Sequence, residues 1–189
     1  MVTGALLSSC SRDGGVETES RSDELPDEVI TEFVTEETDV GRARWRLSAP
    51  RADRYNNKKM LALEKPTVQF YDGYGNLQST LTSDAGSLYE GEQYMLAYGN
   101  VVVVTYEGDV LETDTLRYLV EEDKIVNDCF NKLTRAGEKT VVTGYGLECD
   151  HNLATVDIKR DVEAVFIDED GLIQDPSLEG DEGNADDGS

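Results

Sequence analysis

Apolar and polar side chains alternate in short runs along the middle of the chain, and the clearest case is Ala97–Tyr118. Within it, Asn100–Tyr106 is almost entirely β-branched or aromatic, a composition that suits a pleated, half-buried surface. Gly108 marks a turn after this run, and Val110–Thr113 and Leu116–Val120 follow as two further strand-like runs. The pattern therefore predicts three strands separated by short turns.

The same arrangement fills the chain between residues 42 and 167, where Gly, Asn and Asp residues separate the runs and no apolar pattern of helical length occurs. Many short strands at even spacing are typical of an antiparallel sandwich, jelly roll or barrel. We therefore predict an all-β domain over residues 42–167. Its strands are predicted at Arg44–Ala49, Lys59–Leu63, Thr67–Tyr71, Leu77–Leu81, Gly86–Tyr89, Tyr94–Tyr98, Asn100–Tyr106, Val110–Thr113, Leu116–Val120, Lys124–Asn127, Phe130–Thr134, Thr140–Thr143, Leu147–Asp150, Ala154–Lys159 and Val162–Ile167.

Strand geometry assigns these side chains to faces, because successive side chains in a strand point to opposite sides of the sheet. One face carries Ala97, Gly99, Val101 and Val103. Small residues followed by valines indicate an inner face with room on it. A tightly packed sandwich core fits the same spacing, so both interpretations stay open.

The negative charge of the chain lies mostly outside the predicted domain. The formal net charge is −23, but Ser11–Gly41 holds eleven acidic and two basic side chains, and Asp168–Ser189 holds nine acidic and no basic ones. The middle is therefore only mildly acidic. This distribution argues against a nucleic-acid partner, because phosphate binding needs a basic surface. No run of eighteen apolar residues is present, which argues against a membrane-spanning helix in the sequence.

The N-terminal ten residues end in Leu7-Ser8-Ser9-Cys10, which resembles a lipobox, the site at which bacterial lipoproteins are acylated on cysteine. The apolar part before it is shorter than that of an ordinary signal peptide, so we expect the true start to lie upstream. An incidental cysteine is the alternative. Residues 11–41 are predicted to be an acidic linker, with a possible short helix where Val29, Ile30, Phe33 and Val34 have helical spacing. Residues 168–189 are predicted to be a disordered acidic tail.

An ordered set of short motifs resembles the OstA-like proteins, and among them the LptC family of the lipopolysaccharide-export machinery. The set covers roughly Arg44 to Phe166. It comprises A-x-G-N-V-x-V from Ala97, then x-G-x-x-L-x-T, x-L-x-Y, Trp45, Tyr55-x-x-x-Lys59, Lys65–Asp72, Gly75, Leu81-Thr82-Ser83 and Gly144-Tyr145-Gly146-Leu147 with Asp150. The resemblance implies an antiparallel β-jelly roll with an open, apolar seam. A transmembrane helix precedes the β-domain in that family and is missing here, and we expect an acyl anchor to replace it.

The resemblance implies a lipid-carrying role. The protein is expected to bind lipopolysaccharide, to receive it from the subunits of an inner-membrane ABC transporter, and to pass it to a periplasmic bridge protein. Location in the cell envelope, on the periplasmic side, follows. The function favours an inner-membrane anchor through Cys10, whereas Ser11 after the cysteine favours the outer membrane. Alternatives are an LptA/OstA-like bridge protein, a structural envelope lipoprotein with a filled β-core, and a carbohydrate-active enzyme on a β-scaffold.

The resemblance and the alternation together give candidate site residues. The lipid-facing set is Val68, Phe70, Leu77, Leu81, Ala97, Gly99, Val101, Val103, Leu111, Leu116, Tyr118, Val142, Gly144 and Val156, with space expected at Ala97, Gly99 and Gly144. The last strand, with Val162, Ala164 and Phe166 on one face, is expected to be the edge that docks the bridge protein.

No constellation for catalysis, a metal or a cofactor is apparent in the sequence, so none is predicted. The one histidine, His151, is expected to be a solvent-exposed turn residue. Cys129 and Cys149 are predicted either to form a disulfide or to be two small buried thiols.

Overall fold

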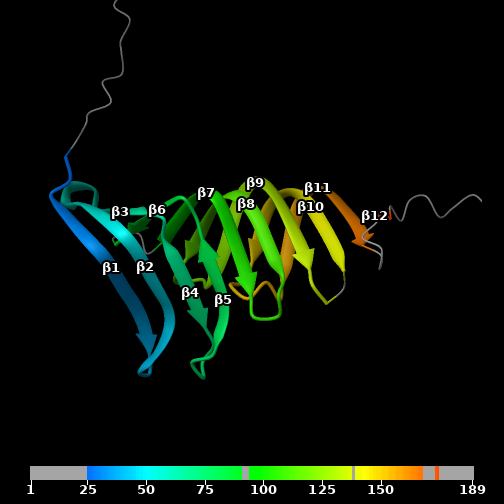
Figure 1. Cartoon of the computed structure of the whole chain (residues 1–189), viewed down its shortest axis with the longest axis horizontal. Helices are drawn as coiled ribbons and strands as arrows, with labels where there is room; N and C mark the ends of the chain where they lie inside the picture. Colours follow the sequence, from blue (N-terminus) through cyan, green and yellow to red (C-terminus); the bar gives the residue numbers. More distant parts are fainter. Residues whose placement is uncertain (1–24, 91–93, 138, 168–172, 175–189) are drawn as a thin grey trace, which may run out of the picture.

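The computed structural model describes residues 25–90, 94–137, 139–167 and 173–174 of the chain, and these residues form one antiparallel sheet (Figure 1). The strands run in the order β12-β11-β10-β9-β8-β7-β5-β4-β2-β3-β6, with β1 paired to β2 and β6 also paired to β7. Their bounds are β1 (Glu28–Asp39), β2 (Arg42–Tyr55), β3 (Met60–Glu64), β4 (Thr67–Tyr71), β5 (Leu77–Thr82), β6 (Ala85–Tyr89), β7 (Tyr94–Thr105), β8 (Val110–Leu119), β9 (Lys124–Arg135), β10 (Thr140–Cys149), β11 (Val156–Ile167) and β12 (Ile173–Gln174), with a single 3₁₀ turn, η1 (Asn56–Lys58). The all-β prediction is confirmed.

A line of irregularities crosses the sheet and bends it. In β7 the left-handed residues Gly99 (φ 76°) and Asn100 (φ 46°) form a bulge, and the register with β8 shifts between Tyr98 and Val101. Similar shifts interrupt the β8–β9, β9–β10 and β10–β11 ladders. Bulges of this kind bend a strand and increase its twist. Together they form a crease along which the sheet folds onto itself.

The crease divides the sheet into two half-sheets. Half-sheet A contains β3, β6 and the segments paired on their side, namely 28–31, 51–55, 94–98, 116–119, 124–127, 147–149 and 156–160. Half-sheet B contains β4, β5 and the segments 33–39, 42–48, 101–105, 110–113, 131–135, 140–143 and 162–167. The two halves face each other as a jelly roll, and we call the side away from the crease, where their turns meet, the seam.

The crease explains why the observed strands are longer than the predicted ones. Each of β7 to β11 joins two predicted strands, because the polar or glycine residues between them form bulges and not turns. In β2, Pro50 lies where the strand passes from β4 to β3, and it appears in none of the three ladders of β2. A proline is tolerated there because no ladder hydrogen bond needs its missing N–H.

The prediction of a linker over residues 11–41 is wrong in its second half, because Glu28–Asp39 form the twelve-residue strand β1. The folded domain therefore begins before residue 42. Glu32 has φ 52°, and the β1–β2 ladder is interrupted there without a change of register, since Thr31 pairs with Arg51 and Phe33 with Ala49. Ile30 and Phe33 therefore both pack against the core, and their i, i+3 spacing imitates a helix. The acidic side chains of β1 pair with arginines of β2, as in Arg46–Glu36 and Arg54–Glu28.

The C-terminal boundary is also corrected. Residues 173–174 form β12, which pairs with Phe166 and Ile167 inside what we predicted to be a disordered tail. The rest of that tail, and the predicted lipobox with Cys10, lie outside the described residues.

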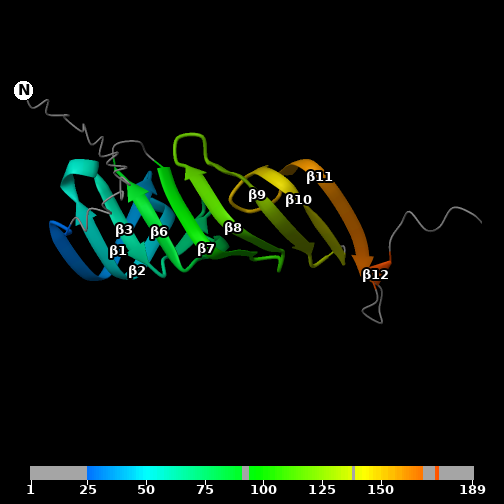
Figure 2. The same cartoon turned by 90° about the horizontal axis from the view of Figure 1, so that it is seen from above.

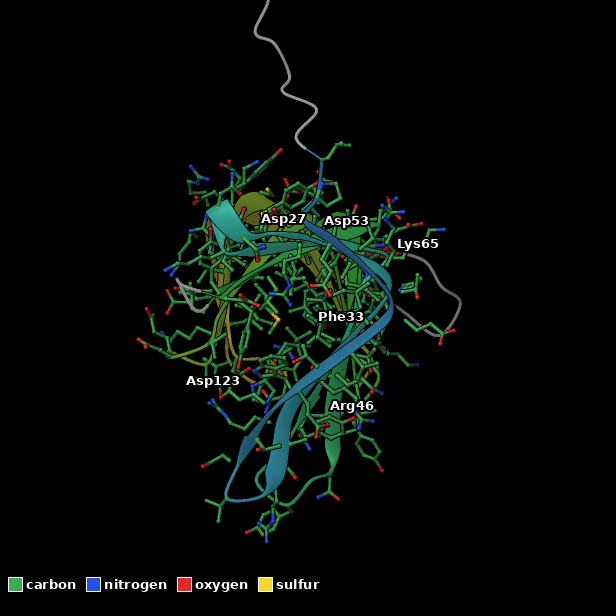
Figure 3. All side chains as sticks on the ribbon, turned by 90° about the vertical axis from the view of Figure 1, so that its left-hand side faces the viewer. Asp27, Phe33, Arg46, Asp53, Lys65 and Asp123 are labelled. Carbon is green, nitrogen blue, oxygen red and sulfur yellow. The ribbon has the colours of Figure 1, made fainter. Side chains whose placement is uncertain are left out.

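Figure 2 shows the strands as a single row from β1 to β12, and Figure 3 looks along that row. In Figure 3 the side chains fill the space that the bent sheet encloses, with Asp123 on the side opposite Phe33 of β1. The interior is apolar and contains the buried residues of both half-sheets, among them Trp45, Leu47, Leu61 and Phe70.

Candidate functional site

The interior between the half-sheets is the candidate site, and most of the predicted lipid-facing residues lie in it. Val68, Phe70, Leu81, Ala97, Val101, Val103, Leu111, Leu116 and Tyr118 are all buried there. Val142 and Val156 are half-buried and pack against the same core. Leu77 is the exception, since it is exposed where β5 begins.

The inner and outer faces of β7 separate as alternation requires. Val101 and Val103 are almost completely buried, whereas Val104 is exposed and Val102 is half-buried. The same phase is kept on both sides of Gly99 and Asn100, because Ala97, Val101 and Val103 are all buried.

The interior is filled, contrary to the expected space. Its internal cavity has a volume of about 20 Å³, enough for about one water molecule, and is lined by Leu47, Val68, Met95, Ala97 and Ile125 among others. A Cβ added at Gly144 would lie 2.6 Å from Cγ2 of Ile158, and one added at Gly99 would lie 3.1 Å from the side chain of Asp84. The two glycines therefore permit close contacts at the crease and leave no space for a ligand.

The inner face is open at the C-terminal end of the row. Val142 pairs with Leu133 on one side and with Ala164 on the other, so Val162, Ala164 and Phe166 continue the face that is buried further along. Val162 is nevertheless 53% exposed and Phe166 is 52% exposed. This end presents apolar inner surface to solvent, which is the arrangement that could continue into a neighbouring sheet.

The free edge of β11 is shorter than predicted. β12 pairs with Phe166 and Ile167, so part of the expected docking strip already has a partner. Among the described residues, the outer edge of β11 from Val156 to Val165 has no paired strand.

A polar cluster at the seam was missed by sequence reasoning. Asp123 accepts a hydrogen bond from the Tyr118 hydroxyl at 2.7 Å, lies 3.1 Å from Nδ1 of His151, and is 3.7 Å from Nη2 of Arg44. Arg44 also pairs with Glu37 of β1 at 2.9 Å. Burial, followed by the hydrogen bond to Asp123, raises the pKa of Tyr118 above its ordinary value, so this phenol is a neutral donor.

His151 is not the solvent-exposed residue that we expected. Its ring stacks on Phe70 with centroids 5.4 Å apart, and its backbone carbonyl accepts a hydrogen bond from Ser79 Oγ. The segment after β10 turns inward, and Leu153, which follows two residues later, is completely buried. Alternation could not predict this, because the segment is a turn and not a strand.

The two cysteines of the domain are free thiols. Cys149 pairs with Ile125 across the β9–β10 ladder, whereas Cys129 lies four residues further along β9. At about 3.3 Å per residue this separation exceeds the reach of a disulfide. Within the described ranges, no group of three or more His, Cys, Asp or Glu side chains could hold a metal ion, and no helix has the length and apolarity of a membrane span.

Comparison with known proteins identifies the family. No curated protein sequence matches the chain. Among solved structures, it is similar to LptH, described as the LptA homologous periplasmic component of the conserved lipopolysaccharide transport device from Pseudomonas aeruginosa, with 15% identity and a TM-score of 0.49 over 65% of this chain and 94% of that one. Residues 1–168 match the family model "Lipopolysaccharide-assembly, LptC-related", which confirms the resemblance deduced from the motifs. Because the match covers most of the sequence, the chain belongs to the LptC-related family of lipopolysaccharide assembly.

Proposed function

We propose that this protein binds the acyl chains of lipopolysaccharide between its half-sheets, receives the lipid from an inner-membrane ABC transporter, and delivers it to a periplasmic bridge protein. The observation that carries the proposal is the continuous apolar inner face, buried from Trp45 to Leu133 and exposed at Val162 and Phe166. Family membership supports the same lipid.

The physical need for such a protein is large. Each methylene group of an acyl chain that is kept out of water is worth about 0.8 kcal/mol, so a lipid with several chains cannot cross an aqueous compartment unaided. Because the interior is filled, the half-sheets separate at the seam to admit a chain. Holding and releasing lipid then requires no chemistry in this subunit, and ATP hydrolysis in the transporter supplies the energy.

The edge of β11 is the proposed docking site for the bridge protein, and Cys10 is the proposed attachment to the membrane on the periplasmic side. An exposed strand edge has unpaired N–H and C=O groups that a partner's strand can take up. Val162, Ala164 and Phe166 would continue the apolar face into the partner.

A structural envelope protein is the second candidate, and the small volume of the cavity favours it. Site-specific photo-crosslinking in cells decides between the two. A crosslinker at Val103 on the inner face is expected to capture lipopolysaccharide, and one at Val104 on the outer face is the matched control. Equal capture at both positions, or none at Val103, would refute the lipid-carrying function.

A further inference from the structure

We propose that the loop between β10 and β11, residues 150–155, is a displaceable strap that closes the seam in the lipid-free protein, and that an entering acyl chain takes the place of Leu153. We call these residues the seam loop. The inference rests on the proposed lipid-binding function, and it identifies the element that has to move before an acyl chain can enter.

The seam loop crosses from one half-sheet to the other. It leaves half-sheet A at Cys149 and returns to it at Val156, yet His151 and Leu153 both contact half-sheet B. His151 reaches Phe70 of β4 and Ser79 of β5, although β9, β8 and β7 lie between β10 and those strands in the sheet. In Figure 1 the gold loop after β10 extends toward β5. The loop therefore bridges the opening that a lipid would have to use.

Leu153 occupies the interior as a lipid chain would. Its side chain is 0% exposed and belongs to the same apolar cluster as the predicted lipid-facing residues. Its backbone has φ 58°, an unfavourable conformation for a leucine, which only the surrounding contacts maintain. An apolar side chain held inward by a strained turn is suited to exchange with another apolar group.

The seam loop is held by the burial of Leu153, by the stacking of His151 on Phe70, and by a set of polar contacts that includes the bond from Ser79 Oγ. Arg135 Nη1 donates to the Leu153 carbonyl at 2.7 Å, and the same Nη1 atom lies 2.7 Å from Asp109 Oδ2. Asp123 contacts His151 at 3.1 Å. Inside the loop, the backbone bonds Asp150 N to Thr155 O and Leu153 N to Asp150 O are 3.3 and 3.2 Å long. No strand ladder holds residues 150–155, so the loop can leave while β10 and β11 stay paired.

The first test measures binding of fluorescently labelled rough-type lipopolysaccharide to the full chain. Leu153→Ala removes the side chain that competes with the lipid, so we expect association to become faster by about tenfold or more, the fold-change that the burial of one leucine represents. Leu61→Ala is the matched control, because Leu61 of β3 is equally buried and loses the same atoms outside the loop. Equal acceleration in both variants would overturn the proposal, since any cavity would then suffice.

The second test needs no variant. Hydrogen exchange of the wild-type chain is followed with and without the lipopolysaccharide, and the amides of residues 150–155 are expected to exchange faster when lipid is bound. If lipid binds but these amides exchange at an unchanged or slower rate, the proposal that lipid displaces the seam loop is wrong, while the proposed lipid-binding function stands. If neither the wild type nor the two variants bind any lipid, both the displaceable seam loop and the proposed function are refuted.

Discussion

Asn127 and Asn131 exchange side-chain hydrogen bonds across the crease of β9, from Asn127 Nδ2 to Asn131 Oδ1 at 2.8 Å and from Asn131 Nδ2 to Asn127 Oδ1 at 3.1 Å. Asn127 also donates to the Thr115 carbonyl at 2.9 Å, and Asn131 to the Cys129 carbonyl at 2.8 Å. The pair thus satisfies backbone groups that the irregular ladders of β8 and β9 leave without strand partners. Asn131 is 0% exposed, so it is a buried amide in an interior whose buried side chains are mostly apolar.

Asn131→Leu is expected to lower the free energy of unfolding by about 1–3 kcal/mol, because Asn127 and the Cys129 carbonyl then lose a buried partner. Urea denaturation followed by circular dichroism measures the change. Combining it with Asn127→Leu gives a double-mutant cycle, in which the two substitutions should be less harmful together than the sum of their separate effects. Strict additivity would show that the two amides do not act as a pair.

Gly144→Ala is expected to destabilise the fold by about 1–3 kcal/mol, the range for overpacking, since the new methyl group would lie 2.6 Å from Ile158 Cγ2 and 2.8 Å from the Arg160 carbonyl. Gly137→Ala, in the β9–β10 turn, is the control because nothing lies within 4 Å of its added Cβ. Thermal denaturation compares the two variants. If Gly144→Ala melts like wild type, the close approach of β11 to β10 is not rigid.

The all-β class and the inner face of β7 were predictable because alternation is a local property, and Val101 and Val103 lie where it places them. The bulges were not predictable, because a glycine such as Gly144 indicates open space and close approach equally well. The left-handed conformation of Glu32 was not predictable either, and it places Ile30 and Phe33 on the core side with a helical spacing. The seam loop depends on contacts between residues far apart in sequence, such as Ser79 with His151, which no local pattern carries.

Alkylation should distinguish the two cysteines of the domain. Burial raises the pKa of the Cys149 thiol to about 12, so the reactive thiolate is scarce near pH 8, and the side chain is also inaccessible. Cys129 is half-buried. Iodoacetamide at pH 8 is expected to modify Cys129 and to spare Cys149 in the native chain, as read by peptide mass spectrometry. In urea both should react, and equal native labelling would contradict the burial of Cys149.

Cys10→Ala is expected to release the protein from membranes. Leu7-Ser8-Ser9-Cys10 resembles an acylation site, and two acyl chains give stable membrane attachment whereas one is marginal. Fractionation of cells that express each form measures the difference, with Cys129→Ala as a control that should stay membrane-bound. Mass spectrometry of the native protein supplies an independent check, because an unmodified Cys10 would exclude the anchor.

The edge of β11 can be tested by two neighbouring prolines, Glu163→Pro and Ala164→Pro. Successive N–H groups of a strand point to opposite sides, so one substitution removes a donor from the β10–β11 ladder and the other removes one from the outer edge. The melting temperature shows which variant is which, because only the loss of the ladder donor lowers it strongly.

From the sequence we predict that Ala164→Pro is the substitution that removes an N–H from the outer edge. This variant should remain folded and take up lipid at its inner face, but it should no longer capture the bridge protein in a pull-down. Val104→Ala, an outward substitution on β7, is the control and should bind normally. Because β12 pairs at Phe166 and Ile167, the partner's strand is expected to lie along residues 156–165. If both proline variants still capture the bridge protein at wild-type strength, docking takes place at another surface.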